Sequence, residues 1–405
     1  MIFPPDHQPA WQYAQASVKD AHIYVQLEHL YILALKKGLG KGDDGDVIGA
    51  QKFFHNSDLG CFAPLCRATD GVVMSLDQAS TKPHERLAAA LSDEMDAVNT
   101  LIRERMASEH APRIPEVTAH LVEAGGKRLR PMMTLASAKM CGYDGPYHVH
   151  LAATVEFIHT ATLLHDDVVD ESEQRRGRPT ANLLWDNTSS VLVGDYLFAR
   201  SFQLMTETGS LDVLRILSNA AATIAEGEVL QLTAARDLAT DEGIYLKVVR
   251  GKTAALFSAA MEVGGVIAGR DAGLVKALFD YGDALGIGFQ IVDDLLDYAG
   301  TDATGKNIGD DFRERKLTLP VIKAVAKADD EERAFWVRTI EKGRQEDGDL
   351  DHALDLMAKH DTLEATRQDA LAWMDTAKAA LDPLPDHDIK TMLLDLADYV
   401  VARVR

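Results

Sequence analysis

Apolar residues recur three and four positions apart in long segments from about Ser75 onward, which is the spacing of one face of an α-helix. These segments are rich in Ala, Leu, Met, Glu and Lys, which favour helices, and alternating runs typical of strands are scarce. The pattern predicts an all-α fold, a single large domain built as a layered helical bundle. The clearest segments are RLAAALSDEMDAVNTLIRERM (86–106), HVHLAATVEFIHTATLLHDDVVD (148–170) and EGIYLKVVRGKTAALFSAAMEV (242–263).

The first 73 residues lack this periodicity and contain a loose glycine and aspartate stretch, GLGKGDDGDVIG (38–49). The stretch does not fit a P-loop, because Lys41 is followed by Gly42. It also lacks the alternating oxygen ligands and closing glutamate of a calcium loop. We therefore predict an N-terminal extension over residues 1–73 and one domain over residues 74–405.

Composition indicates a globular chain of 405 residues, 46% of them hydrophobic, with a formal net charge of −21. This charge argues against nucleic-acid binding, so any anionic ligand must be held by local basic groups or by metal ions. Three sparse cysteines suit a reducing compartment, and we expect a cytoplasmic protein. No signal peptide or transmembrane segment is expected. The most apolar stretch, ALFSAAMEVGGVIAG (255–269), is interrupted by Glu262 and favours a buried helix.

An acidic cluster, HDDVVD, ends the second of the helical segments. His159, Asp166 and Asp170 lie seven and four residues apart, so one helix face carries all three, with Asp167 beside them. Carboxylates gathered in this way repel one another unless cations neutralise them. Their hard oxygen ligands suit Mg²⁺ shared with a substrate phosphate. Alone, such a run is equally typical of a solvated helix end.

A second acidic cluster repeats the pattern in GFQIVDDLLDYAG (288–300). Asp293, Asp294 and Asp297 again follow an apolar helical approach, and Gln290 lies one turn earlier on the same face. Segments this far apart can face each other across a bundle of antiparallel helices. A cavity with carboxylates on both sides would hold several divalent ions.

Compact basic groups then indicate bound anions in an acidic protein. A guanidinium group forks onto phosphate oxygens, and a lysine acts as a mobile point charge. We expect Arg128, Arg313 and Arg315 to pair with nearby acids instead. The groups are GGKRLRP (125–131), RRG (175–177), GKT (251–253) and GKNIGDDFRERK (305–316).

With these motifs in order, residues 75–405 resemble the trans-polyprenyl diphosphate synthases, most closely the long-chain members that make octaprenyl to decaprenyl diphosphates. The resemblance covers about four fifths of the chain and implies an isoprenoid-synthase-type helical bundle around a deep central cavity. It rests on GGKRLRP, HTATLLHDDVVDESEQRRGRPT, GEVLQL, GKTAALF, and GFQIVDDLLDY followed by GKNIGDD.

The resemblance implies a role for each motif residue. The diphosphate of isopentenyl diphosphate would be held without metal, and the allylic diphosphate through Mg²⁺, with three ions at each active site. Isopentenyl diphosphate would contact Lys127, Arg130, His159 and Arg176. The metal ligands would be Asp166, Asp170, Asp293, Asp294 and Asp297, and Asp167 would belong to the catalytic cluster. The allylic substrate and its leaving group would contact Arg175, Lys252, Thr253, Gln290 and Lys306.

The implied reaction is head-to-tail condensation of an allylic diphosphate, such as farnesyl diphosphate, with successive isopentenyl diphosphates, to supply the ubiquinone side chain. Ionising an allylic diphosphate separates a cation from an anionic leaving group, which explains the need for metals and basic side chains. The growing chain would run beside the helix before Asp166, where Ala161 and Thr162 are small. These two residues predict a long product, although small residues also simply allow close helix packing.

Three other functions compete with this interpretation. A class I terpene cyclase also uses an aspartate cluster and Mg²⁺, but needs neither the basic pocket nor a second cluster. Loss of one acidic cluster would have supported a non-catalytic subunit of a heteromeric synthase, but both clusters are present. A plain helical scaffold would not need five ordered motifs. The family suggests a homodimer, and the sequence leaves open a peripheral membrane contact for product release.

Overall fold

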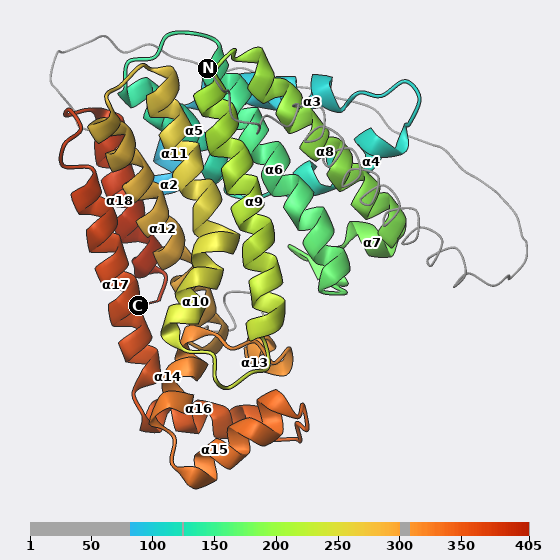
Figure 1. Cartoon of the computed structure of the whole chain (residues 1–405), viewed down its shortest axis with the longest axis vertical. Helices are drawn as coiled ribbons and strands as arrows, with labels where there is room; N and C mark the ends of the chain where they lie inside the picture. The colour runs from blue at the N-terminus through green and yellow to red at the C-terminus, as the bar shows by residue number, and fades with distance from the viewer. Residues whose placement is uncertain (1–81, 124, 300–307, 405) are drawn as a thin grey trace, which may run out of the picture. The chain divides into compact units, whose positions relative to one another are not determined.

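The structure, a computed structural model, describes residues 82–123, 125–299 and 308–404, and the predicted N-terminal extension lies outside them (Figure 1). The described chain is almost entirely helical, which confirms the all-α prediction, and its strands form one short hairpin. The N-terminal half contains α2 (Pro83–Ala90), α3 (Ser92–Met106), α4 (Arg113–Glu123), α5 (Leu129–Met140), α6 (Tyr147–Val169), β1 (Gln174–Arg175), β2 (Arg178–Pro179), α7 (Ala181–Leu184), α8 (Asn187–Glu207) and α9 (Leu211–Ala234). The C-terminal half contains α10 (Glu242–Val249), η2 (Arg250–Ala254), α11 (Ala255–Ile267), α12 (Ala272–Ala299), α13 (Asp310–Arg313), α14 (Leu319–Lys327), α15 (Asp330–Trp336), η4 (Val337–Glu341), α16 (Asp349–Lys359), α17 (Thr362–Ala380) and α18 (Asp388–Ala402).

The predicted helical segments are present, with two refinements. The segment 86–106 is divided at Leu91, which separates α2 from α3. The segment 242–263 runs through α10 and α11 but contains a π-helical turn, η2, at GKT. Such turns often occur at functional sites, because the extra residue turns side chains away from the regular helical direction.

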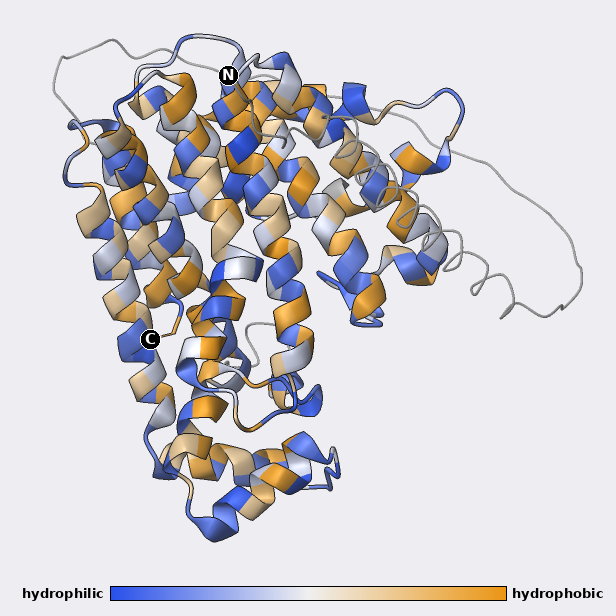
Figure 2. Ribbon diagram, in the orientation of Figure 1, coloured by the Kyte–Doolittle hydropathy of each residue, from blue (hydrophilic) through white to orange (hydrophobic). Residues whose placement is uncertain are grey.

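Helix α11 is the centre of the bundle and packs against α5, α6, α9 and α12. Figure 2 shows hydrophobic residues concentrated along it, as expected of a helix buried on nearly all sides. The prediction of a buried helix at 255–269 is therefore confirmed. In Figure 1, α9, α11, α12 and α17 run side by side. Helix α6 packs against α11 as well, so α11 contacts both α6 and α12. Helices α6 and α12 can thus face one cavity without packing tightly on each other.

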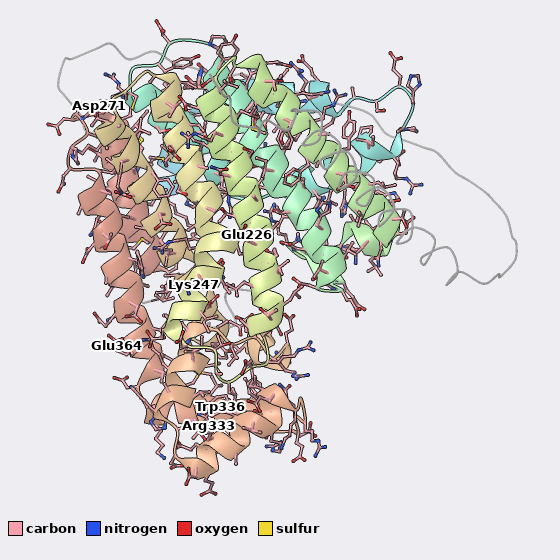
Figure 3. The ribbon with its side chains drawn as sticks, in the orientation of Figure 1. Glu226, Lys247, Asp271, Arg333, Trp336 and Glu364 are labelled. Atoms are coloured by element: carbon pink, nitrogen blue, oxygen red, sulfur yellow. The ribbon has the colours of Figure 1, made fainter. Side chains whose placement is uncertain are left out.

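A second, smaller core joins α13, α14, α15, η4 and α16. Trp336 is fully buried there, with its ring centroid 5.1 Å from that of Phe335 and 6.4 Å from that of Phe312. Figure 3 marks Trp336 and Arg333 on α15 at this end of the bundle. The aromatic cluster packs α13 and α15 together, since Phe312 belongs to α13 and Phe335 and Trp336 to α15.

Among the described residues, no helix has the length and apolarity needed to cross a membrane.

Candidate active site

Four residues predicted to bind isopentenyl diphosphate line one cavity, of 410 Å³. Lys127 and Arg130 come from the loop before α5 and its first turn, His159 from α6, and Arg176 from the β1–β2 turn. Phe257 of α11, Phe289 and Asp293 of α12, and Arg403 after α18 complete much of its wall. The same cavity therefore reaches from the helix of the first acidic cluster to the helix of the second.

Local backbone geometry explains the glycines beside these cations. Gly125 and Gly126 both have positive φ, and a Cβ on Gly126 would lie 2.7 Å from Arg176 Nη1. Only glycine lets the guanidinium approach the backbone this closely. Arg176 and Gly177 form the two-residue turn between β1 and β2, and both have positive φ, as a hairpin of this length favours. The motifs GGKRLRP and RRG thus form two parts of one pocket wall.

Three cations of this cavity, Lys127, Arg130 and Arg176, form no ion pair with a carboxylate among the described residues, whereas Arg128 and Arg403 do. Arg130 Nη1 lies 3.3 Å from His159 Nε2, and its guanidinium lies 4.4 Å from the Phe257 ring centroid. Its Nε is buried without a hydrogen-bond partner in the described chain. Burial lowers the pKa of Arg130 to about 10. Burial and the neighbouring Arg130 hold the pKa of His159 well below its ordinary value, so His159 is neutral at pH 7. An unmatched buried guanidinium indicates a site for an anion.

The first acidic cluster divides into two environments. Asp167 is fully buried, and its Oδ1 accepts from Arg175 Nε at 2.9 Å and pairs with Arg175 Nη2 at 2.7 Å. Asp166 is half-buried and Asp170 exposed, one turn apart at the end of α6. Burial raises the pKa of Asp166 to about 7, while the positive charge of Lys252 opposes this shift. Asp166 is thus a carboxylate whose charge the protein matches incompletely.

Lys252 joins this cluster from η2. Its Nζ donates to Glu228 Oε2 on α9 at 2.8 Å. The contact depends on two glycines: a Cβ on Gly251 would lie 2.8 Å from the Cα of Gly227. The motifs GKTAALF and GEVLQL therefore meet through a close backbone approach that places Lys252 between Glu228 and Asp166.

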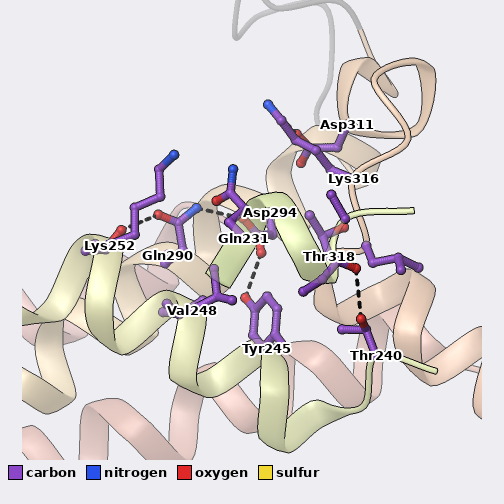
Figure 4. Close-up of a pocket in the computed structure, with 15 residues that line it drawn as sticks. Gln231, Thr240, Tyr245, Val248, Lys252, Gln290, Asp294, Asp311, Lys316 and Thr318 are labelled. Atoms are coloured by element: carbon purple, nitrogen blue, oxygen red, sulfur yellow. Dashed lines mark hydrogen bonds and ion pairs between the residues drawn. The ribbon is translucent and has the colours of Figure 1, made fainter. Parts of the chain in front are cut away.

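Gln290 and Thr253 meet in a second cavity, shown in Figure 4. Thr253 Oγ1 donates to Gln290 Oε1 at 2.8 Å, and Gln290 Nε2 donates to Asp294 Oδ1 at 2.7 Å. The other Asp294 oxygen accepts from Tyr245 Oη at 2.6 Å. Asp294 is buried, and both its carboxylate oxygens are engaged by protein donors. Lys252, Asp311 and Lys316 line the same cavity.

The other members of the second cluster differ from Asp294. Asp293 lies closer to solvent, and its Oδ1 is 3.0 Å from Arg403 Nη1 as an ion pair. Asp297 Oδ2 accepts from the backbone N–H of Asp311 at 3.1 Å, which ties α12 to α13. Lys306 lies outside the described residues.

The two residues expected to set product length lie on α6 as the periodicity indicated. Ala161 is fully buried in the main core, and Thr162 is half-buried with its hydroxyl donating to His159 O at 2.8 Å. Their small size is compatible with a tunnel and with close packing alike, so the chain-length role stays a prediction.

Magnesium fits the carboxylates in pairs. No group of three or more His, Cys, Asp or Glu in the described parts of the chain is arranged to hold an ion by itself. Mg²⁺ does not need such a group, because it commonly takes one or two carboxylates and completes its shell with water and substrate phosphate oxygens. Asp166 with Asp170, and Asp293 with Asp297, supply such oxygen pairs, each one turn of helix apart.

Sequence reasoning was correct for two of the three arginines expected to pair with acids. Arg128 Nη1 donates to Glu156 at 2.8 Å, and Arg313 Nη1 donates to Asp310 at 2.7 Å. The expectation for Arg315 was wrong. Its Nε and Nη2 donate instead to the backbone carbonyl oxygens of Ile340 and Glu341, at 2.7 and 2.6 Å. A guanidinium near the end of a helical turn can satisfy carbonyls that lack an intrahelical partner.

Three residues of the site were missed: Glu228, Tyr245 and Arg403. Glu228 lies inside the GEVLQL motif, and its acidic side chain two residues from Glu226 was a usable signal. Tyr245 and Arg403 carry no such signal, because their partners lie far away in the sequence and only the packing of α10 and α18 brings them to α12.

Comparisons with known proteins show what the chain is similar to. Residues 111–357 match the family model described as polyprenyl synthetase. The chain is 45% identical over 322 residues to octaprenyl diphosphate synthase of Escherichia coli K12, covering 79% of this chain and 99% of that protein. A crystal structure of a decaprenyl diphosphate synthase from Rhodobacter capsulatus is 76% identical, with a TM-score of 0.78 over 80% of this chain and 100% of that chain.

A third relative was crystallised with ligands. The polyprenyl synthase from Caulobacter crescentus CB15, complexed with calcium and isoprenyl diphosphate, is 49% identical, with a TM-score of 0.75 over 80% of this chain and 98% of that chain. The family model matches more than half of the chain, and each of these relatives covers about four fifths of it. The chain therefore belongs to the polyprenyl synthetase family.

Proposed function

We propose that this protein is a long-chain trans-polyprenyl diphosphate synthase. It extends an allylic diphosphate such as farnesyl diphosphate with successive isopentenyl diphosphates and supplies the ubiquinone side chain. One observation carries the proposal: a cavity lined by Lys127, Arg130, His159 and Arg176 opens between two helices that end in carboxylate clusters. Lys127, Arg130 and Arg176, which form no ion pair with a carboxylate in the described part of the chain, would bind one diphosphate directly. Carboxylates would bind the other through metal ions.

The basic cavity would hold isopentenyl diphosphate. Arg130 and Arg176 supply forked guanidinium donors, and Lys127 a mobile charge at the more exposed edge. Neutral His159 accepts from Arg130 and so orients that guanidinium. Phe257 and Phe289, which also line the cavity, would cover the hydrocarbon end of the substrate and keep water out.

The allylic diphosphate would lie between the two acidic clusters. Bound Mg²⁺, which we expect as three ions held by Asp166, Asp170, Asp293 and Asp297, would neutralise the charge that builds up on the leaving diphosphate. Lys252 and Arg175 would add positive charge on the same side. The oxygens of Thr253 and Gln290 would face the carbon end, where negative dipole ends stabilise an allylic cation without attacking it.

Carbon–carbon bond formation then needs no side-chain nucleophile. The double bond of isopentenyl diphosphate attacks the allylic cation, and the proton lost from the new chain passes to the departing diphosphate. The protein supplies orientation, charge and exclusion of water. A reaction of this kind agrees with a site made of basic side chains and carboxylates, because it requires neither a nucleophilic side chain nor a base to activate one.

Product analysis tests the proposal. Purified protein is incubated with Mg²⁺, farnesyl diphosphate and radiolabelled isopentenyl diphosphate, and the dephosphorylated products are separated against prenol standards. A band of eight to ten isoprene units is expected, as the names of the octaprenyl and decaprenyl relatives suggest. A short product would leave the chemistry intact but contradict the role of Ala161 and Thr162. A cyclised hydrocarbon without isopentenyl incorporation would favour a terpene cyclase, and no product at all a non-catalytic subunit.

We expect the catalytic domain to be residues 74–405, so a protein that begins at Met74 should keep the activity.

We also expect a homodimer, because large apolar side chains are exposed along two adjacent helices. Light scattering after gel filtration tests this state. The exposed apolar side chains are Leu192 and Phe202 on α8 and Val229 and Leu232 on α9.

A cytoplasmic location and a peripheral membrane contact during product release stay predictions.

A further inference from the structure

A chain of three hydrogen bonds links α10, α12 and η2 beside the second cavity (Figure 4). It runs from the Tyr245 hydroxyl through the Asp294 carboxylate to the Gln290 amide, and it ends where Thr253 donates to that amide. Its bonds measure between 2.6 and 2.8 Å. Tyr245, Asp294 and Thr253 are all buried, so water cannot easily replace any partner in the chain.

The chain determines which way the Gln290 amide points. An amide has a donor end and an acceptor end, and the two are similar in shape, so its neighbours decide the orientation. An ionised carboxylate only accepts, so Asp294 requires the NH₂ group of Gln290 on its side. The amide oxygen then faces the Thr253 hydroxyl and the cavity that both residues line. The reverse orientation would present N–H groups, the positive end of the dipole, to that cavity.

Asp294 can orient Gln290 only while its own position is secured. Gln290 occupies one of its oxygens, and Tyr245 is the protein donor to the other. Without the Tyr245 hydroxyl this second oxygen would be buried and unsatisfied, and the carboxylate would rotate toward another donor. Lys316 lines the same cavity, and its positive charge acts on Asp294, so it is a candidate for this donor.

We infer that Tyr245 is a positioning residue of the reaction, acting through Asp294 to hold the Gln290 amide oxygen toward the allylic cation. This inference rests on the proposed function. It gives Asp294 a role in orienting Gln290 instead of binding metal, since both of its oxygens already accept from protein donors. Tyr245 itself does not contact the reacting atoms.

The substitution Tyr245→Phe tests the inference, because it keeps the buried ring and removes only the hydroxyl. We expect the rate of a single condensation, measured by rapid quench with saturating substrates, to fall about 10-fold, in the range seen when outer partners of a site are removed. The KM values for both diphosphates should stay within twofold, since neither substrate loses a contact. The matched control is Tyr281→Phe, because Tyr281 lies in the same helix as Gln290. This substitution removes a buried hydroxyl that donates a hydrogen bond to Leu393 O at 2.8 Å.

A double-mutant cycle separates positioning from general structural damage. In a Gln290→Leu background there is no amide to orient, so Tyr245→Phe should cause no further loss of rate. The inference is overturned if Tyr245→Phe keeps the full rate, if it slows both backgrounds equally, or if Tyr281→Phe slows the reaction as much. Should Tyr245→Phe fail to fold, Asp294→Leu tests the same chain, because it removes the carboxylate that accepts from Gln290 Nε2; an undiminished rate there would equally overturn the inference.

The unaltered protein distinguishes the two levels of failure. If it does not incorporate isopentenyl units at all, the proposed function fails. If it elongates normally and the cycle shows no coupling between Tyr245 and Gln290, the function stands and only the positioning role is lost.

Discussion

The two acidic helix ends share one spacing of three aspartates, and the protein surrounds them differently. In each cluster the middle aspartate is buried, and at least one neighbour lies closer to solvent. At the end of α6, buried Asp167 is paired with the charged Arg175. In α12, buried Asp294 is held by the neutral donors Tyr245 and Gln290, and it is Asp293 that pairs with an arginine.

This difference shows that the repeated motif determines where the aspartates lie, whereas the packing of other elements determines which side chains pair with them. A charged partner for the buried acid ties the first cluster to the β1–β2 hairpin that carries Arg176. Neutral partners in the second cluster connect the buried acid to the amide of Gln290, whose dipole the proposed reaction uses. We therefore expect substitutions at equivalent positions of the two clusters to have different consequences.

The largest effect should come from Asp166, the half-buried acid of the first cluster. Asp166→Asn removes a predicted metal ligand, and we expect the initial rate of isopentenyl incorporation to fall about 10³-fold. Chelation of Mg²⁺ should abolish the activity of the unaltered protein. Stability in urea should not decrease, because burial raises the pKa of Asp166 to about 7 and so already disfavours its charged form.

Asp212→Asn serves as the control for that experiment, since Asp212 is an exposed acid at the start of α9. It should leave both rate and stability unchanged. An Asp166→Asn protein that keeps a substantial part of the original rate would contradict the metal role.

The next effect concerns the charged anchor of the first cluster. Arg175→Met leaves the fully buried Asp167 carboxylate without its cation, and we expect the free energy of unfolding to fall by about 3 kcal/mol. The neutral anchor should respond less, with Tyr245→Phe costing about 1 kcal/mol. Urea unfolding of the three proteins measures the contrast. Combining Arg175→Met with Asp167→Asn should recover much of the loss, and equal losses for the two anchors would remove the distinction between the clusters.

Much of this contrast lay beyond the sequence, for a physical reason. Helical periodicity correctly predicted the helices that carry the two acidic clusters, because it depends on neighbours three and four residues apart. The four residues that the family resemblance assigned to isopentenyl diphosphate line one cavity, and their role stays a prediction. The partners of the acids come from other helices. Tyr245 lies 49 positions from Asp294, and Arg403 approaches Asp293 from the far end of the domain. No local pattern encodes such contacts, and likewise none revealed the π-helical turn at Lys252.

A smaller effect is expected from Arg403, the cation of the second cluster. Its Nη1 pairs with Asp293 but makes no hydrogen bond in the described chain, and the residue lines the basic cavity. We therefore expect Arg403→Gln to raise the KM for isopentenyl diphosphate about 10-fold, the value of one hydrogen bond to a charged group, with little change in kcat. Initial-rate kinetics with varied isopentenyl diphosphate measure this. Arg367→Gln, in the exposed Arg367–Glu364 pair of α17, is the control. An unchanged KM would exclude Arg403 from substrate binding.

The smallest effect is expected at an acid outside the cavity, where the protein supplies every partner. Glu332 of α15 is buried and accepts from Lys359 and His360, and these hydrogen bonds lower its pKa to about 2. Since its pKa in the unfolded chain is near 4.5, the unfolded state binds the proton more readily. The stabilisation is therefore complete above pH 4.5 and is lost as pH falls toward 2.

Glu332→Gln should weaken this dependence, so that the stability of the variant and the parent converge between pH 4.5 and 2 while activity at neutral pH is unchanged. Thermal unfolding at several pH values measures it. Glu364 of α17, marked in Figure 3, is the matched comparison, because two neighbours also hold its pKa near 2 while water screens its exposed pair. Glu364→Gln should change the pH dependence less. The contrast with Asp166 is then complete: an acid that the fold satisfies fully stabilises the protein, and an acid left short of partners is available to a metal ion.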